Sequence, residues 1–191
     1  MIFVETGLAG AWLIEPEPAR DERGFFLRTF CEREFAMRGL CIRFVQHSVS
    51  YSRRKGTLRG MHFQRAPHGE VKLVRCAKGK IFDVIIDLRR DSHTCGQWRA
   101  FELTCGNQRQ LYIPEGFAHG FQTLCDGVEV DYAISAFYAP EAASGVRFDD
   151  PAFGIRWPLP VTSISIRDMG WPRLDLGSLA PYPSTTLRES A

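Results

Sequence analysis

Residues 70–91 read EVKLVRCAKGKIFDVIIDLRRD and contain two apolar runs separated by Gly79. Similar runs, rich in Val, Ile, Phe and Leu, recur along the chain between Gly, Pro and Asp residues. They are CIRFVQHSVSYS (41–52), QWRAFELTCG (97–106), RQLYIPEG (109–116), AHGFQTLCDG (118–127) and VEVDYAISAFYAP (128–140). Short strands at this spacing are typical of an antiparallel sandwich or barrel. The sequence therefore predicts an all-β fold.

One early helix is expected at CEREFAMRG, residues 31–39. Helical spacing places Phe35 on the same side as Cys31 and Arg38, and Gly39 can end the helix in a left-handed conformation. A few short helices of this kind are compatible with an all-β domain.

Length and charge narrow the class of protein. The chain has 191 residues, which suits one domain, residues 1–191. Its 24 basic and 22 acidic residues give a net charge of +2, too little for the positive field that nonspecific nucleic-acid binding needs. The chain contains no apolar run of about 18 residues and opens without a signal-peptide pattern. We therefore expect neither nucleic-acid nor membrane partners.

Six cysteines are scattered along the chain without a CxxC pair. This spacing argues against a zinc knuckle or a redox motif. Several cysteines lie in apolar runs, as small core residues do. We expect a cytoplasmic protein with reduced thiols.

The stretch TLRGMHFQRAPHGEVKLVRC, residues 57–76, has two histidines, a glutamate and a lysine within strand-forming sequence. These side chains can bind a metal, one histidine can transfer protons, or all can form the solvent face of a sheet. The later stretch IPEGFAHGF resembles the second motif of the cupins. Its His119 would complete a metal site with His62, His68 and Glu70. The spacing fits poorly, because metal-binding cupins usually have a second histidine where Gln64 stands.

A second resemblance covers residues 20–170. The stretches DERGFF, GTLRGMHFQ, VKLVR, GKIFDVIIDLRRDSHTCGQW, LYIPEGFAHGF, DYAISAFYAPEAASGVRFDDPAFGIRWP and SISIRD occur in an order and spacing that resemble dTDP-4-dehydrorhamnose 3,5-epimerases. The resemblance implies a cupin-type double-stranded β-helix, or jelly roll, with its core at about residues 40–140. A C-terminal segment, 141–175, and a partly disordered tail, 176–191, would follow.

The same resemblance implies an isomerase that acts without cofactor or metal. Its substrate would be a nucleoside-diphosphate 4-keto-6-deoxy sugar, inverted at C3, C5 or both during deoxysugar biosynthesis. It also implies a homodimer in which the segment around Arg23 lies near the partner's pocket. The family's catalytic residues match His62, Asp168, Tyr132 and Lys72 of this chain. The expected substrate-binding residues are Arg23, Phe26, Arg28, Gln46, Ser48, Arg59, His119 and Tyr138.

These residue types suit the chemistry. Removing a proton beside a ketone needs a base and a cation that stabilises the enolate, which His62 and Lys72 can supply. A carboxylate such as Asp168 can fix the imidazole tautomer, provided that the fold brings it to His62. Inversion needs a proton donor on the other face, and a tyrosine can act there. Arginine forks suit diphosphate oxygens.

Three positions depart from the family pattern. Arg28 stands where glutamate is expected, Ser48 where asparagine is expected, and Glu70 where glutamine is common. These departures suggest the same chemistry on a related sugar nucleotide, or an epimerase that inverts only one centre. Two other functions stay open on the sequence alone: a metal-dependent cupin oxygenase or isomerase, and a catalytically silent sugar-nucleotide binding protein.

Overall fold

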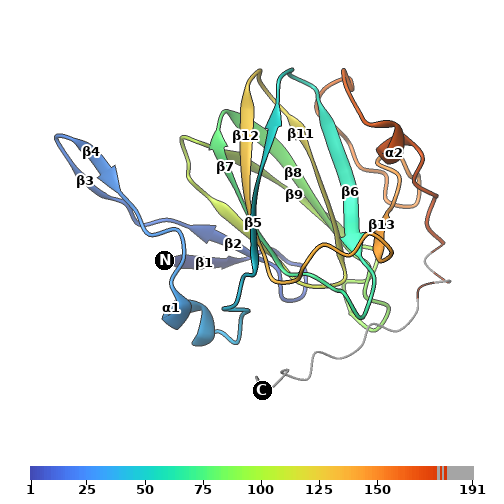
Figure 1. Cartoon of the computed structure of the whole chain (residues 1–191), viewed down its shortest axis with the longest axis horizontal. Helices are drawn as coiled ribbons and strands as arrows, with labels where there is room; N and C mark the ends of the chain where they lie inside the picture. The colour runs from blue at the N-terminus through green and yellow to red at the C-terminus, as the bar shows by residue number, and fades with distance from the viewer. Residues whose placement is uncertain (176, 178, 180–191) are drawn as a thin grey trace.

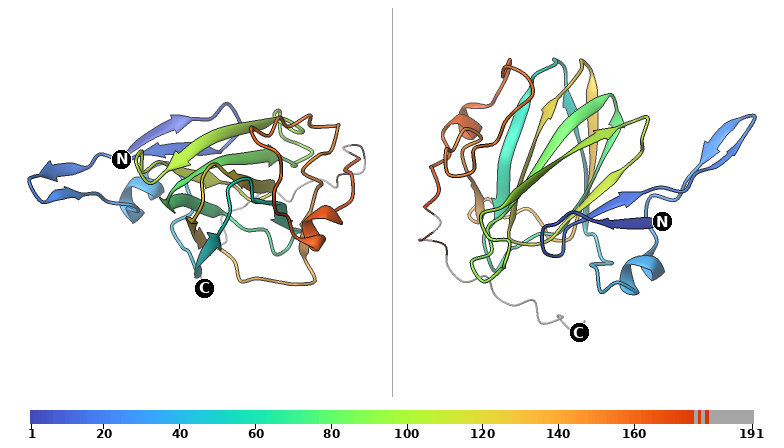
Figure 2. Two further views of the ribbon diagram at one scale, coloured as in Figure 1. Left: turned by 90° about the horizontal axis from the view of Figure 1, so that it is seen from above. Right: turned by 180° about the vertical axis from the view of Figure 1, so that it is seen from behind.

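The computed structural model describes residues 1–175, 177 and 179, which form two facing antiparallel sheets and a separate hairpin (Figures 1 and 2). The first sheet has the order β1 (Ile2–Glu5), β2 (Trp12–Glu15), β10 (Gln110–Ile113), β7 (Lys72–Lys78), β12 (Val128–Ile134) and β5 (Gln46–Ser52). The second has the order β13 (Ala143–Gly145), β6 (Leu58–Gln64), β11 (Phe117–Thr123), β8 (Lys80–Asp87) and β9 (Trp98–Thr104). The hairpin consists of β3 (Ala19–Asp21) and β4 (Gly24–Phe26). The all-β prediction is confirmed.

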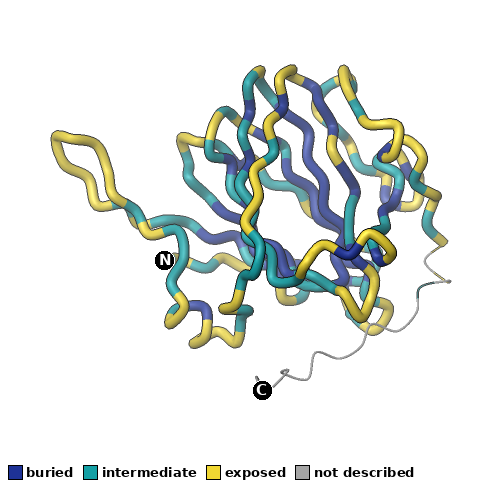
Figure 3. The backbone as a smooth tube through the Cα atoms, viewed as in Figure 1, coloured by how far each residue is buried: buried dark blue, intermediate teal, exposed yellow. Residues whose placement is uncertain are grey.

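The main core lies between the two sheets, where the tube of Figure 3 is mostly dark blue. Val74 and Leu111 of the six-stranded sheet contribute to the same apolar cluster as Ile81 and Phe121 of the five-stranded sheet. A second cluster covers the other face of the five-stranded sheet, where Phe153 packs near residues of β6, β8 and β11. Because apolar residues cover both faces, every residue of β11 is buried.

Gly79 forms the turn between β7 and β8. Its φ is +80°, a conformation that favours glycine, and a Cβ atom there would lie 2.9 Å from both Cys125 Sγ and Val128 Cγ2. The glycine that separates the two apolar runs of residues 70–91 therefore allows the chain to pass directly from one sheet to the other.

Two short helices flank the sheets. Helix α1 (Glu32–Ala36) buries Phe35 against Phe3 and Phe30, and Gly39 follows it with a φ of +65°. The predicted early helix and its glycine stop are thus confirmed. Helix α2 (Ile166–Met169) contacts β6, as Figure 1 also shows.

The sheets extend beyond the segment 40–140 that was expected to form the jelly roll. Strands β1 and β2 precede that segment and join the six-stranded sheet, whereas β13 follows it and pairs with β6. The β3–β4 hairpin projects away from both sheets (Figure 1). The predicted disordered tail, 176–191, lies outside the described residues except for 177 and 179. Neither helix in the described part of the chain has the length and apolarity needed to cross a membrane.

Candidate active site

The two histidine motifs of the sequence lie on neighbouring strands. His62 of β6 is the direct partner of His119 of β11. On the facing sheet, β7 and β12 carry Lys72 and Tyr132. Strand pairing explains this grouping, because residues far apart in sequence become neighbours across a sheet. At the sheet edge Arg59 of β6 donates to atoms of β5, reaching Ser52 Oγ at 3.1 Å and Tyr51 O at 2.8 Å.

His62 forms a hydrogen bond with a carboxylate from the C-terminal segment. The distance from His62 Nε2 to Asp168 Oδ1 is 2.6 Å, and Gly60 N donates to the other carboxylate oxygen at 3.2 Å. Ser165 Oγ caps α2 by accepting from Asp168 N at 3.0 Å, which fixes the backbone of the aspartate. The His62 side chain is 42% exposed, whereas that of Asp168 is 6% exposed. The imidazole can therefore be reached from outside while its partner cannot.

The pKa of Asp168 lies below the ordinary aspartate value. Burial by itself raises this pKa, but the hydrogen bonds and positive charge of His62 and the donors from Gly60 and Ser165 outweigh burial. Asp168 is consequently a carboxylate at neutral pH. It can hold one imidazole tautomer and stabilise the imidazolium formed after proton capture.

Lys72 connects the two sheets beside the histidine. It is buried, its Nζ donates to the backbone oxygen of His62 at 3.3 Å, and the same Nζ lies 3.0 Å from Glu70 Oε1. The structure thus brings together the predicted base and the predicted enolate-stabilising cation.

His119 has a carboxylate partner of its own. Its Nε2 lies 2.9 Å from Asp83 Oδ2, and both side chains are buried. Burial raises the pKa of Asp83, although the charges of His119 and Lys72 act in the opposite direction. Tyr132 packs edge-on against His119 with ring centroids 6.0 Å apart. Burial and the charge of Asp83 both raise the pKa of Tyr132, so its phenol is protonated at neutral pH.

A tryptophan lies against His62. The ring centroids of Trp171 and His62 are 6.2 Å apart in an edge-to-face arrangement. A Cβ atom at Gly145, which pairs with His62 across β13 and β6, would collide with the Trp171 ring. The glycine therefore permits the C-terminal segment to pack against the histidine.

Other predicted binding residues lie around β5 and the loop after β12. Tyr138 is exposed, its backbone N donates to Gln46 Oε1 at 2.7 Å, and its hydroxyl accepts from Arg167 at 3.3 Å. Ser48 is exposed on β5 and pairs with Tyr132 of β12. Arg167 directly precedes Asp168 in α2, so its contact with Tyr138 places these predicted binding residues next to the His62–Asp168 pair.

The remaining predicted residues lie on or after the projecting hairpin, away from the chain's own His62. Arg23 forms an ion pair with Asp21 at 2.6 Å. Phe26 is 76% exposed, and the exposed Arg28 lies 3.9 Å from Glu34. Figures 1 and 2 show that the hairpin extends away from β6 and β11. The chain's own fold does not bring these three residues to His62.

The four ligands of the metal-binding alternative have separate partners. Besides the pairs already described for His62, Glu70 and His119, the exposed His68 lies 3.8 Å from Glu141. Within the described residues, no three His, Cys, Asp or Glu side chains are grouped so that they could hold a metal. The ligand set expected from the cupin motifs is therefore not assembled.

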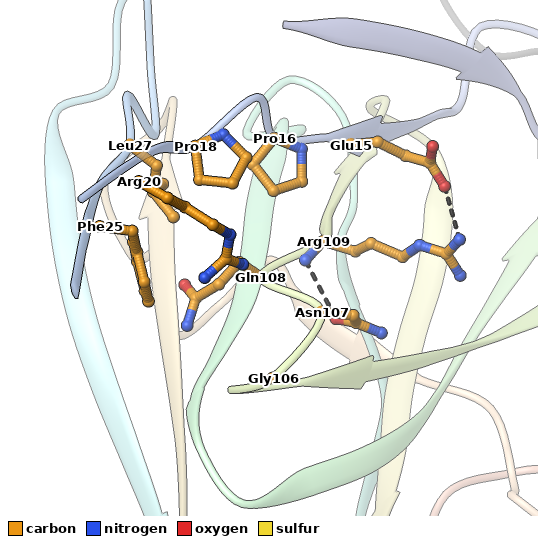
Figure 4. Close-up of a pocket in the computed structure, with 10 residues that line it drawn as sticks. All are labelled: Glu15, Pro16, Pro18, Arg20, Phe25, Leu27, Gly106, Asn107, Gln108 and Arg109. Atoms are coloured by element: carbon orange, nitrogen blue, oxygen red, sulfur yellow. Dashed lines mark hydrogen bonds and ion pairs between the residues drawn. The ribbon is translucent and has the colours of Figure 1, made fainter. Parts of the chain in front are cut away.

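A pocket of about 270 Å³ lies at the base of the hairpin rather than at His62 (Figure 4). Its lining consists of Glu15, Pro16, Pro18, Arg20, Phe25, Leu27, Gly106, Asn107, Gln108 and Arg109. Arg109 is engaged by Glu15 at 2.6 Å, and the lining includes neither histidine nor tyrosine. The groups suited to proton transfer are those around His62.

Comparison with known proteins assigns the chain to a family. A family model described as dTDP-4-dehydrorhamnose 3,5-epimerase matches residues 5–175. The chain belongs to this epimerase family. A relative of that name from Methanothermobacter thermautotrophicus is 50% identical over 173 residues, covering 88% of this chain and 92% of the relative.

Solved structures of the epimerase family agree with this assignment. The Bacillus anthracis dTDP-4-dehydrorhamnose 3,5-epimerase, crystallised with TDP and PPi, has a TM-score of 0.88 and 41% identity, covering 91% of this chain and 99% of that chain. A 3′-monoepimerase from Streptomyces bikiniensis in complex with dTDP-quinovose has a TM-score of 0.83 and 31% identity, covering 92% of this chain and 91% of that chain. The predictions of a cupin-type jelly roll and of a sugar-nucleotide epimerase, an isomerase, are confirmed.

Sequence reasoning missed three residues of this epimerase site. Asp83 lies in the middle of the apolar run KIFDVIID, and a carboxylate between buried apolar residues needs a buried partner, which was a usable signal. Arg167 and Trp171 flank the predicted Asp168, and Arg167 stacks over the Trp171 ring at 5.1 Å. No periodic pattern marks them, because α2 has only four residues and the chain at Trp171 is irregular.

Proposed function

We propose that His62 is the base that removes a ring proton beside the ketone of a nucleoside-diphosphate 4-keto-6-deoxy sugar. The observation that carries this proposal is the 2.6 Å contact between a half-exposed imidazole and the buried carboxylate of Asp168. The carboxylate favours the imidazolium that proton capture produces. His119 is less suited to this step, because it is buried and paired with Asp83.

Lys72 stabilises the enolate oxygen in this proposal, and Tyr132 returns a proton from the opposite face. The buried ammonium beside His62 supports the first role, since a fixed cation near a developing oxyanion lowers the barrier most where water is excluded. The position of Tyr132 on β12 of the facing sheet, edge-on to His119, supports the second, because it places a phenol across the site from β6, the strand of His62. The inversion transfers no net electrons, so these proton transfers need no redox cofactor.

Substrate binding is proposed for Arg59, His119, Tyr138, Gln46 and Ser48 of the same subunit. Arg59 is exposed at the junction of β5 and β6, where a guanidinium can bind diphosphate oxygens. Binding the diphosphate would position the sugar ring between His62 and Tyr132.

We further propose a homodimer in which the partner's hairpin, with its copies of Arg23, Phe26 and Arg28, completes the site. Two adjacent exposed aromatic residues, Phe25 and Phe26, on a projecting hairpin support this arrangement, because such side chains are usually covered. Light scattering should give the mass of a dimer at micromolar concentration. A monomer under those conditions would contradict the proposal.

The nucleotide is proposed to be dTDP or a close relative, with base or ribose recognition altered by Arg28. The ligands named for the B. anthracis and S. bikiniensis structures motivate the choice of nucleotide. A guanidinium offers only donors where the family's glutamate offers only acceptors. Calorimetry with dTDP, UDP, CDP and GDP should give a preference that shifts in Arg28→Glu. A dTDP preference unchanged by that substitution would rule out the role of Arg28.

Proton NMR of candidate 4-keto sugars in heavy water tests the reaction itself. The expected result is enzyme-dependent deuterium incorporation at C3, C5 or both, with inversion at each exchanging centre. The pattern also distinguishes a 3,5-epimerase from a monoepimerase. Nucleotide binding without any deuterium incorporation would instead identify a catalytically silent binding protein.

Action in the cytoplasm is proposed as well. All six cysteines are free, which is usual in reducing compartments. Alkylation of the six thiols in freshly lysed cells, measured by mass spectrometry, should find them reduced.

A further inference from the structure

The ion pair between Glu70 and Lys72 connects a family departure to the proposed enolate-stabilising cation. Glu70 lies two residues before Lys72, which is the first residue of β7. Val71, between them, points the other way into a separate apolar cluster. The Glu70 carboxylate lies 3.0 Å from the Lys72 ammonium.

Both members of the pair are largely removed from water. The side chains of Lys72 and Glu70 are 9% and 12% exposed. Opposite charges interact more strongly where water is scarce, so each side chain orients the other. The ammonium also donates to the backbone oxygen of His62, and this second contact further restrains the position of Lys72 Nζ. One ammonium hydrogen remains for a substrate oxygen.

Glu70 offsets the positive charge of Lys72 at this point of the site. Lys72 supplies one positive charge and Glu70 one negative charge, and the charge of Lys72 also acts on the buried Asp83. With glutamine at position 70, the ammonium would keep an acceptor beside it but lose the adjacent negative charge. An enolate oxygen bound to Lys72 is repelled by a carboxylate at that distance.

We infer that Glu70 is a positioning residue that holds Lys72 at the ketone and, by its charge, limits how strongly Lys72 stabilises the enolate. This inference rests on the proposed function of Lys72 and adds a residue that sets the rate of that step. Glu70 itself does not move the substrate proton, because its carboxylate is turned to the ammonium.

Two substitutions separate the orienting effect from the charge effect. Glu70→Gln keeps an acceptor for Lys72 and removes the charge, whereas Glu70→Ala removes both. The measurement is deuterium incorporation into saturating 4-keto sugar in heavy water, together with the dissociation constant of dTDP. Glu15→Gln is the matched control, because Glu15, the last residue of β2, forms an ion pair with Arg109, and β2 lies far from β6 (Figure 1).

The expected order of exchange rates is Glu70→Gln above the native enzyme and Glu70→Ala below it. The gain in Glu70→Gln should be about tenfold, smaller than the 100- to 1,000-fold effect of removing an oxyanion donor outright. The dissociation constant of dTDP should stay within about twofold in Glu70→Gln, and Glu15→Gln should resemble the native enzyme in both measurements.

An exchange rate in Glu70→Gln equal to or below the native rate, in protein with a native circular dichroism spectrum, overturns the inference. A purely structural role would lower stability and rate together and would not raise the rate. Failure of the proposed function gives a different result, because the native enzyme would then exchange no proton of any 4-keto sugar tested. The two failures are thus distinguishable.

Discussion

The two histidine–aspartate pairs have the same chemical groups on neighbouring strands but different surroundings. His62 is half-exposed and pairs with Asp168, whose pKa is lowered by several donors. His119 is buried and pairs with the fully buried Asp83, whose pKa is raised. The comparison teaches that solvent access and the number of donors, rather than residue type, distinguish the pair proposed to transfer a substrate proton from the pair buried in the core.

The largest expected effect is the loss of His62. In His62→Ala the group that accepts the proton is absent, and general bases typically contribute a factor of about 100 to 10,000. Deuterium exchange and inversion should both fall by that range, while calorimetry should still detect nucleotide binding. If His119→Ala abolished exchange and His62→Ala did not, the assignment of the two pairs would be reversed.

Tyr132→Phe should separate exchange from inversion. His62 could still form the enolate and return a proton to the original face, so deuterium would enter with retained configuration. Inversion should fall by about 100-fold, and exchange by less than about tenfold, because only inversion needs the donor on the other face. NMR measures both in one sample. Undiminished inversion would assign the acid role to another group, with Tyr138 the first candidate.

His119→Phe should affect stability more than exchange. The substitution leaves the buried Asp83 without its partner, and breaking such a pair typically costs about 3–5 kcal/mol. Burial raises the pKa of Asp83 in the folded state, so the folded protein binds this proton more tightly than the unfolded chain does. The stability gained from that proton is fully present below the unfolded aspartate pKa of about 3.9 and is lost as pH rises from there through the raised folded pKa.

The free energy of unfolding of His119→Phe should therefore fall further below the native value at pH 8 than at pH 5, as measured by urea titration. The native enzyme, measured at both pH values, is the control. A loss independent of pH would mean that lost packing, rather than the charge of Asp83, causes the destabilisation.

Ser165→Ala gives the smallest expected effect. Loss of the helix cap typically costs about 1 kcal/mol and would loosen the backbone that presents Asp168 to His62. Exchange should slow by only a few-fold, because the carboxylate keeps its bonds to His62 and Gly60. An effect as large as that of His62→Ala would mean that Asp168 depends on α2 far more than these contacts imply.

The hairpin illustrates what a single chain leaves undecided. The resemblance placed Arg23, Phe26 and Arg28 at the substrate, yet the β3–β4 hairpin projects away from β6, the strand that carries His62. Their sequence motif was recognisable because it is local. In the proposed homodimer, their position relative to a site depends on how the two subunits pack.

The alternation of apolar runs with Gly, Pro and Asp residues is a local property of the chain. For that reason the sequence by itself determined the all-β class, the early helix at Phe35 and the turn at Gly79. It also identified His62, Lys72 and Tyr132 as chemically suitable. Only the tertiary structure decided that Asp168, 106 positions after His62, lies against that histidine, that Asp83 pairs with His119, and that Glu70 pairs with Lys72. The first two pairings arise from strand registers and segment packing between distant parts of the chain. The exposure of each pair to water is set when the two sheets pack together. Residue spacing in the sequence does not encode that exposure.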